Sequence, residues 1–243
     1  MSSPAASSER PPPEAIDRRE RIQLTYWQGV GRRLTRDPIS MVCAGILMLM
    51  VGAAIFAPWI APMDPYKISI LNRLQPIGTA GHFLGTDELG RDMLSRLIYG
   101  GRVSLTMGLL PIMVATLIGS TLGIIAGYFG GKINMVIMRI TDVFFAFPSV
   151  LLAVGIAGAL GAGPANVLLS LSLVFIPPIT RVAESATTQI RNQDFVEAAR
   201  ATGASAPRII VGHVLTNVTS LILTYASSLI GVSIVLAAGL SFL

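Results

Sequence analysis

Charged residues are scarce in this 243-residue chain, in which only 13% of positions are Asp, Glu, Lys or Arg. A soluble domain carries roughly a quarter of its residues as charges. Hydrophobic residues make up 52% of the chain, and the mean hydropathy is +0.67. This composition argues against a water-soluble domain and predicts an integral membrane protein.

Residues that commonly carry catalysis or bind metals are also rare. The single cysteine, Cys43, lies in an apolar run, so no disulfide framework is available. The two histidines, His82 and His213, are far apart in the sequence and are expected on opposite sides of the membrane, which argues against a metal site. Lys132 lacks the spacing of a phosphate-binding loop, and neither a nucleophile elbow nor an H-E-x-x-H pattern is present. The sequence therefore predicts a protein that is not an enzyme and that binds no cofactor itself.

Two further features are missing. No cleaved signal peptide is evident, because its apolar core would lie within about the first 15–30 residues, and residues 1–13 have the composition of a disordered tail. Carboxylates are missing near the midpoint of every apolar run, which argues against an ion-coupled carrier. Between residues 16 and 34, apolar side chains share one helical face among arginines. A helix on the membrane surface and a plain charged linker fit this pattern equally well.

Long apolar runs are what the sequence does contain, near residues 38–56, 105–126, 143–160, 167–180 and 218–243. A helix needs about 20 apolar residues to cross the hydrocarbon core. Asp37-Pro38 supplies an N-cap and a first-turn proline for the first run. Thirteen of the 18 Lys and Arg residues fall on one side of the resulting arrangement, so the positive-inside rule places the N-terminus in the cytoplasm. The predicted fold is an all-α polytopic transmembrane helical bundle with about five spans.

Small and charged residues predict contacts between the spans. Gly119, Gly123 and Gly127 recur every four residues, which creates a smooth groove that lets another helix approach closely. Arg139 and Asp142 are three residues apart, and we expect them to form an ion pair at the inner interface.

Prolines are expected to break or kink the helices, because proline lacks a backbone donor and clashes with the preceding turn. They occur within the runs at Pro111, Pro148 and Pro177-Pro178. Two interpretations remain open: the breaks are ordinary features of packing, or they shape a pathway for a solute.

The segment "GTDELGRDMLSRLIYGG", residues 85–101, predicts an amphipathic helix at the outer membrane interface. Its apolar side chains form one stripe opposite an Asp92–Arg96 pair at i, i+4. Gly100-Gly101 is expected to end this helix. Two roles fit: the helix receives a substrate-binding protein, or it braces the second span.

The stretch most like a soluble protein is "QDFVEAARATGASAPRIIVGHVLTNV", residues 193–218. One face of a short helix carries small and apolar side chains, at Phe195, Ala198, Ala199 and Thr202. Glu197 and Arg200 lie beside this face at i, i+3. Gly203 stands where a left-handed C-terminal cap is required, and Ser205 is expected to cap the next helix with Pro207 in its first turn. The pattern predicts a helix, a sharp corner and a second helix that offer a shallow docking surface; the alternative is a surface loop that packs only on itself.

Several stretches together resemble the permease subunits of ABC importers, in the branch that carries dipeptides, oligopeptides and nickel. "EAARATGAS" followed by "IIVGHVLTNV" resembles the EAA loop, the cytoplasmic segment that seats in a cleft of the ATPase subunit. "HFLGTDELGRDMLSRLIYGGRVSL", "YFGG" and "DVFFAFPSVLLA" are similar to the same branch. The resemblance covers residues 37–243 and implies a multi-pass protein of the bacterial inner membrane.

The resemblance assigns roles to particular residues. ATPase-subunit docking falls on Phe195, Glu197, Ala198, Ala199, Gly203, Ala204 and Ser205. The outer-loop family motif comprises Gly85, Thr86, Asp87, Gly90, Arg91, Asp92, Ser95 and Arg96. The implied partners are a homologous second permease, two ATPase subunits that bind ATP and Mg²⁺, an extracytoplasmic solute-binding protein and membrane lipid, but no nucleic acid.

Three departures from the family pattern are visible. Leu215-Thr216-Asn217 stands where relatives carry Leu-Pro-Asn, and Glu184 follows Arg181 where a second basic residue is usual. The chain ends at "GLSFL", where relatives continue into a sixth span. The resemblance thus predicts a truncated chain or fragment that transports weakly by itself.

The expected organisation has four parts: a cytoplasmic tail at 1–37, a first span at 38–57, an outer loop at 58–104 and a transmembrane domain at 105–243, which includes the docking loop 181–217. The expected function is that of a permease subunit in an ATP-driven importer of a di- or oligopeptide, or of nickel or a related solute. The subunit would supply part of the translocation path and couple it to ATP hydrolysis in its partners by alternating access. The alternative is a non-transporting membrane scaffold or assembly subunit, which would need no ATPase docking.

Overall fold

The computed structural model describes residues 37–241. The charged tail with its candidate surface helix, residues 1–36, lies outside the described residues. The chain divides into two units, residues 1–49 and 50–243, and each is described by itself. α2 (Pro38–Ile55) starts in the first unit at the predicted cap, because the Asp37 carboxylate accepts hydrogen bonds from the Ile39 amide at 3.2 Å and the Ser40 hydroxyl at 2.5 Å.

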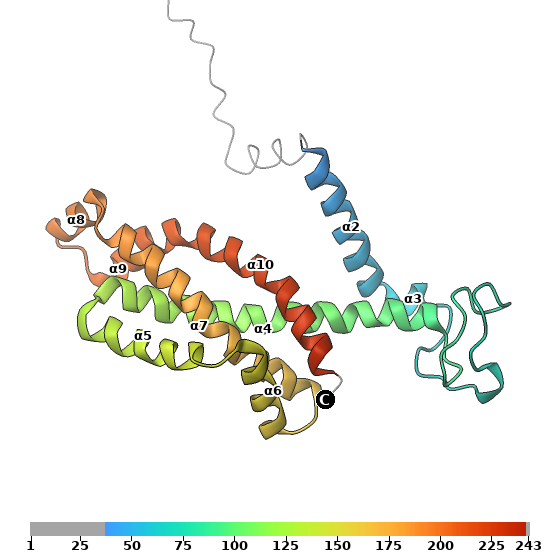
Figure 1. Cartoon of the computed structure of the whole chain (residues 1–243). Helices are drawn as coiled ribbons and strands as arrows, with labels where there is room; N and C mark the ends of the chain where they lie inside the picture. Colours follow the sequence, from blue (N-terminus) through green and yellow to red (C-terminus); the bar gives the residue numbers. More distant parts are fainter. Residues whose placement is uncertain (1–36, 242–243) are drawn as a thin grey trace, which may run out of the picture. The chain divides into compact units, whose positions relative to one another are not determined.

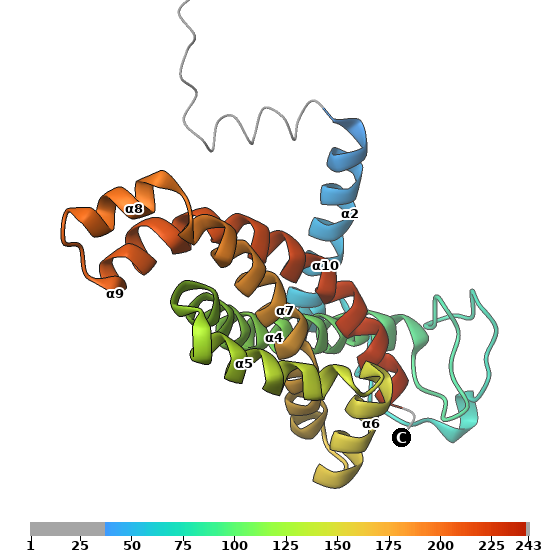
Figure 2. The same cartoon turned by 60° about the vertical axis from the view of Figure 1, so that its left-hand side comes forward.

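Three long helices form the core of the second unit: α4 (Met93–Phe129), α7 (Pro164–Arg191) and α10 (Thr216–Leu240). Figures 1 and 2 show α7 alongside one half of α4, with α10 crossing both helices. The apolar side chains buried in this core include Ile112, Ala115, Leu171, Ile179, Val218 and Ile222. This core confirms the prediction of a helical bundle.

The glycine groove predicted on α4 is where α7 packs. A Cβ atom added at Gly123 would lie 2.4 Å from the Thr180 carbonyl oxygen, and one at Gly127 would lie 2.7 Å from the Glu184 carbonyl oxygen. At Gly119 the nearest carbonyl oxygen of α7 would be 2.9 Å away. Real Cβ atoms do not approach a backbone this closely, so α4 and α7 can pack in this way only with glycine at these positions.

α4 begins earlier than predicted. The amphipathic helix expected as a separate element is the start of α4, which runs from Met93 without a break through Gly100-Gly101. The expectation that these glycines end the helix is wrong. Neither has a positive φ, and the cost of about 1 kcal/mol for each glycine in a helix is small against the backbone hydrogen bonds of the long apolar helix that follows.

Two of the three proline sites do not break their helices. Pro111 lies inside α4, and Pro177-Pro178 lies inside α7. At Pro111 the structure shows how the helix continues. Proline cannot donate to the Met107 carbonyl four residues earlier, so that carbonyl needs another donor. The buried Ser233 hydroxyl of α10 donates to that carbonyl oxygen instead, at 2.9 Å.

The third predicted interruption is confirmed, and it divides the expected third span. α5 (Gly131–Phe145) and α6 (Ser149–Leu160) meet at an angle of 88°, and Pro148 is the N-cap residue of α6. α6 has 12 residues, so its length of about 18 Å is too short to cross a bilayer alone. Within residues 37–241, four helices are long and apolar enough to span a membrane, and α5 with α6 makes a fifth only as a bent pair.

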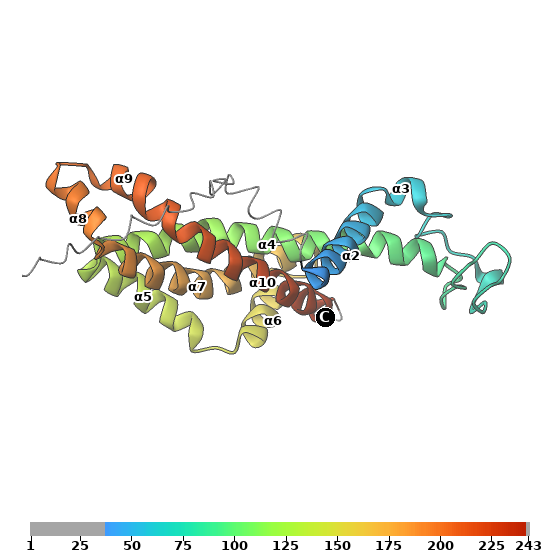
Figure 3. The same cartoon turned by 90° about the horizontal axis from the view of Figure 1, so that it is seen from above.

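Two segments lie outside the helical core, at opposite ends of α4 (Figures 1 and 3). Residues 61–92, which we call the 61–92 loop, follow the short α3 (Ala57–Ile60), include the 3₁₀ turn η1 (Ile70–Asn72) and lead into α4. At the other end, α8 (Asp194–Ala201) and α9 (Ala206–Ile209) follow α7 and form the α8–α9 corner. The π-helical segment η2 (Ile210–Leu215) joins this corner to α10.

Candidate functional site

The α8–α9 corner has the geometry that its sequence predicts. Gly203 adopts a φ of +82°, in the left-handed region. Its amide donates to the Arg200 carbonyl at 2.9 Å, and the Ala204 amide donates to the Ala199 carbonyl at 3.1 Å. These two bonds close the end of α8 in the manner of a Schellman cap and reverse the chain direction.

The start of α9 matches the prediction in backbone conformation but not in side-chain bonding. Ser205 occupies the N-cap position with extended φ and ψ of −69° and 151°, and Pro207 lies in the first turn. The Ser205 side chain makes no capping hydrogen bond. The backbone carbonyl of Ser205 accepts a hydrogen bond from the Ile209 amide at 3.1 Å, so the backbone alone starts the helix.

Val196 anchors α8, although the sequence pattern did not single out this residue. Its side chain is fully buried in the core, while Phe195 is 42% exposed and Glu197 and Ala198 are exposed. Ala199 is half-buried, one turn from Val196. The spacing of Val196 and Ala199 at i, i+3 was the available signal for an inward face.

The predicted docking residues do not all share one surface. Phe195, Glu197, Ala198, Gly203 and Ser205 are exposed, whereas Ala199 and Ala204 are half-buried against the core. The exposed five therefore form the part of the set that another protein can reach.

Side chains of α8 also contact neighbouring elements. The Phe195 ring lies 6.2 Å from the His213 ring in η2, measured between centroids. The Arg200 guanidinium lies 5.2 Å from the centroid of the Tyr128 ring at the end of α4, within the range of a cation–π contact. The predicted pairing of Glu197 with Arg200 is not among the ion pairs described for residues 37–241.

A polar cluster links α5 to α7 at the same end of α4. Asp142 pairs with Arg181 at 2.5 Å, and the Arg181 guanidinium also stacks 4.4 Å from the Phe145 ring centroid. The predicted Arg139–Asp142 pair is therefore wrong: α5 presents Asp142 to α7, where Arg181 is in reach, and Arg139 is exposed. Glu184, which departs from the family pattern, accepts a hydrogen bond from the Asn134 amide group at 2.6 Å.

Asp87 organises the 61–92 loop at the other end of the molecule. One carboxylate oxygen accepts from the Leu89 and Arg91 amides, each at 2.9 Å. The other accepts from the Arg91 guanidinium at 2.8 Å and pairs with Arg96. Burial alone would raise the pKa of this carboxyl, but the backbone and side-chain hydrogen bonds from Arg91, the Leu89 amide and the Arg91 charge lower it to about 2.

Two glycines and one threonine hold separate segments of the 61–92 loop together. Gly85 and Gly90 have φ values of +74° and +71°, and a Cβ on Gly90 would lie 1.8 Å from the Ser69 carbonyl oxygen. The Thr86 hydroxyl donates to the Asn72 carbonyl and accepts from the Gln75 amide, the latter at 2.9 Å. These contacts give the family motif of the outer loop a structural role.

Asp92 and Ser95 fasten the loop to the start of α4. Asp92 is the N-cap residue of α4 and accepts from the Ser95 amide at 2.8 Å and the Ser95 hydroxyl at 2.7 Å. Its other oxygen lies 3.0 Å from Nδ1 of the buried His82. Burial raises the pKa of Asp92, but these Ser95 and His82 contacts lower it overall. The predicted Asp92–Arg96 pair is wrong, because Asp92 is taken by the cap and Arg96 pairs with Asp87.

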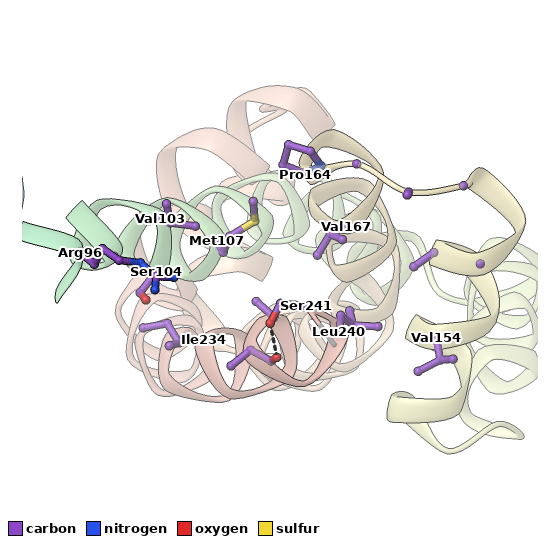
Figure 4. A pocket seen from close by; sticks show the side chains of 18 residues that line it. Arg96, Val103, Ser104, Met107, Val154, Pro164, Val167, Ile234, Leu240 and Ser241 are labelled. Carbon is purple, nitrogen blue, oxygen red and sulfur yellow. Dashed lines mark hydrogen bonds between the residues drawn. The ribbon is translucent and has the colours of Figure 1, made fainter. Parts of the chain in front are cut away.

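A cavity of about 1030 Å³ lies between α4, α6, α7 and α10, towards the end of α4 that carries the loop. Figure 4 shows Arg96, Val103 and Met107 of α4 on one side and Val154 of α6 on another. The lining is mostly apolar, with Arg96 as its charged residue. Such a volume accommodates a small peptide-sized ligand.

These features define a class of protein: a multi-pass helical membrane protein with the α8–α9 corner at one end of α4, the 61–92 loop at the other end and a cavity between its helices. Comparison with known proteins agrees. Residues 119–243 match the family described as the binding-protein-dependent transport system inner membrane component. Residues 25–76 match the N-terminal TM domain of oligopeptide transport permease C.

Individual relatives support the same assignment. The glutathione transport system permease protein GsiD of Pectobacterium atrosepticum is 36% identical over 225 residues, which cover 93% of this chain and 75% of that protein. The protein of the same name from Escherichia coli O6:K15:H31 is 39% identical over 219 residues, which cover 90% of this chain and 72% of that protein. The chain belongs to the binding-protein-dependent transport family, as an inner-membrane permease subunit of an ABC importer. It is a transporter subunit and not an enzyme.

Proposed function

We propose that this permease couples solute transport to ATP hydrolysis through the α8–α9 corner, which docks into ATPase subunits on the cytoplasmic side. The exposure of Phe195, Glu197 and Ala198 on a helix that Val196 anchors in the core carries the proposal. A helix held from beneath offers its outer face without unfolding, and the Gly203 cap sets the direction of that face. The resemblance of this stretch to the EAA loop points to the same surface.

The docking set is the one that the sequence indicates, Phe195, Glu197, Ala198, Ala199, Gly203, Ala204 and Ser205. We assign direct contact to its exposed members, and to Ala199 and Ala204 the role of seating α8 against the core. The partners are two ATPase subunits, which bind ATP and Mg²⁺, a homologous second permease, and an extracytoplasmic binding protein that delivers the solute.

We extend the proposal to the solute, a short peptide of the size of glutathione. The named activity of the GsiD relatives and the volume of the cavity support this class. In this proposal the cavity forms part of the translocation path. Two glycines of α6 allow a matched test of this path. Gly158 lines the cavity and Gly155 does not, and a Cβ atom at either position would meet nothing within 4 Å.

Gly158→Trp is expected to fill the cavity and to lower uptake of labelled glutathione at least about tenfold, whereas Gly155→Trp leaves uptake within about twofold. Both variants should reach the membrane in equal amounts. Equal uptake by the two variants would remove the cavity from the path.

Docking is tested by co-purification of the ATPase subunits. Glu197→Lys reverses an exposed charge on α8 and should reduce the bound ATPase about tenfold, the loss expected when a charge in the contact is reversed. Gly203→Val should also reduce the amount of bound ATPase, because valine disfavours the left-handed conformation and opens the corner. Gly203→Asn should leave the bound ATPase unchanged, because asparagine tolerates that conformation.

Glu88→Lys is the control, because it makes the same charge change at an exposed position in the 61–92 loop. Full retention of the ATPase subunits by both Glu197→Lys and Gly203→Val would refute the docking proposal and favour a scaffold that needs no ATPase.

A further inference from the structure

Arg200 and Tyr128 join the docking corner to α4, and neither belongs to the docking set. The Arg200 guanidinium lies 5.2 Å from the Tyr128 ring centroid. Tyr128 is 7% exposed, and its ring meets the Phe129 ring edge-on at 5.2 Å. The ring face that receives the cation is therefore held in place. Building on the proposed function, we infer that this pair is the positioning contact that transmits movement of α8 to α4.

Val196, Ala199 and the chain on either side connect α8 to the core, and Arg200 adds a contact with α4. The covalent route from α7 to α8 runs through Asn192 and Gln193, which are outside both helices. Val196 is buried close to this joint, so α8 can tilt about it while Val196 stays in the core. Arg200 lies one turn further along α8, so its contact with Tyr128 converts a tilt of α8 into a displacement of α4.

α4 is built to carry such a displacement to the cavity. Gly127, next to Tyr128, and Gly123 one turn away hold α4 against the backbone of α7, so a push on Tyr128 moves the two helices together. α4 continues without interruption for 37 residues, about 55 Å. Val103 and Met107 near its other end line the cavity. Movement at the corner thus reaches the cavity through one continuous helix.

The test measures transmission directly, by the accessibility of a cysteine placed in the cavity. Val103→Cys in a Cys43→Ala background is labelled in membrane vesicles that hold the assembled transporter, with and without ATP and Mg²⁺. We expect ATP to change the labelling rate. Arg200→Gln and Tyr128→Leu should each reduce that change roughly threefold to tenfold, as loss of one cation–π contact implies, with ATPase co-purification unchanged.

Two comparisons separate a coupling contact from a merely structural one. Tyr128→Phe keeps the aromatic face and should keep the ATP-dependent change. The double variant of Arg200→Gln with Tyr128→Leu should be no worse than either single variant, because both remove the same contact. Arg208→Gln, an exposed arginine of the same corner, is the control for loss of positive charge.

Several results would overturn the inference. These are additive losses in the double variant, an equal loss in Tyr128→Phe, and a labelling rate of the parent Val103→Cys protein that ATP does not change. If Tyr128→Leu fails to accumulate in the membrane, Arg200→Gln against Arg200→Lys decides, since lysine retains the cation. Loss of the ATPase subunits from Arg200→Gln would make Arg200 a docking residue, which refutes the inference and leaves the proposed function standing.

Discussion

At the scale of single residues, the 61–92 loop separates two reasons for requiring glycine. Gly78 and Gly90 both have left-handed φ values, +87° and +71°. A Cβ on Gly78 would meet nothing within 4 Å, whereas a Cβ on Gly90 would collide with the Ser69 carbonyl at 1.8 Å. The first position needs glycine for conformation alone, and the second needs it for space as well.

Gly78→Ala should cost about 1 kcal/mol of stability, the price of a left-handed conformation. Gly90→Ala should cost about 2–4 kcal/mol, because the Ser69–Leu89 backbone pairing must also shift. Thermal unfolding of the two variants in detergent measures the difference. Equal destabilisation would contradict the close approach of Gly90 to the Ser69 carbonyl.

Asp87 makes the order of the loop depend on pH. Its pKa in the folded protein, about 2, lies below the ordinary aspartate value of 3.8, so the carboxylate stabilises the folded loop fully above about pH 4. This stabilisation is lost as the pH falls from about 4 to 2 and the carboxylate takes up a proton. The protection factors of the Leu89 and Arg91 amides, which are corrected for the intrinsic pH dependence of exchange, should fall over that window. Asp87→Asn should exchange rapidly at neutral pH as well, and protection that persists in Asp87→Asn would contradict this role.

At the scale of helices, α4 and α10 share one hydrogen bond that a proline makes necessary. Pro111 leaves the Met107 carbonyl without its helical donor, and Ser233 of α10 supplies the replacement at 2.9 Å. Ser233 is fully buried, so solvent water cannot reach the Met107 carbonyl to donate in its place. The bond explains how α4 continues through a proline in the middle of the bundle.

Ser233→Ala should destabilise the protein by about 1–3 kcal/mol, the cost of a buried carbonyl without a donor. In a Pro111→Ala background the same change should cost much less, because the alanine amide restores the bond within the helix. Thermal unfolding of the four proteins in this cycle gives the coupling between the two sites. Additive losses of stability would mean that the Ser233 hydroxyl does not replace the donor that Pro111 lacks.

At the scale of the whole molecule, the second unit places its two ordered non-core segments at opposite ends of α4 (Figures 1 and 3). A helix of about 55 Å exceeds the roughly 30 Å of a hydrocarbon core. The corner and the loop therefore emerge on opposite sides of the membrane, as the charge distribution of the sequence also predicts. Because the positive-inside rule predicts a cytoplasmic N-terminus, we expect the corner on the cytoplasmic side as well.

Cysteine labelling from outside intact cells tests this orientation in a Cys43→Ala background. Ile77→Cys, at a 78% exposed position in the loop, should be labelled. Lys132→Cys and Arg200→Cys should be labelled only after the membrane is permeabilised. Labelling of position 200 in intact cells would contradict both the orientation and ATPase docking at the corner.

The sequence by itself determined the features that depend on local composition and spacing. Apolar length predicted the spanning helices, spacing by four predicted the glycine groove, and the requirement for a left-handed cap predicted the corner at Gly203. Each of these follows from interactions within a few turns of one segment. The docking role of the corner and the positions of the domain boundaries remain predictions.

Tertiary structure alone decided which partner each polar group found. Asp142 had Arg139 nearby in sequence yet paired with Arg181, and Arg96 paired with Asp87 and not with Asp92. Pro111 did not break α4, because a serine more than a hundred positions away supplied the missing donor. A carboxylate or a carbonyl bonds to whatever donor the packing brings within about 3 Å, and sequence spacing does not report which distant helix will supply it.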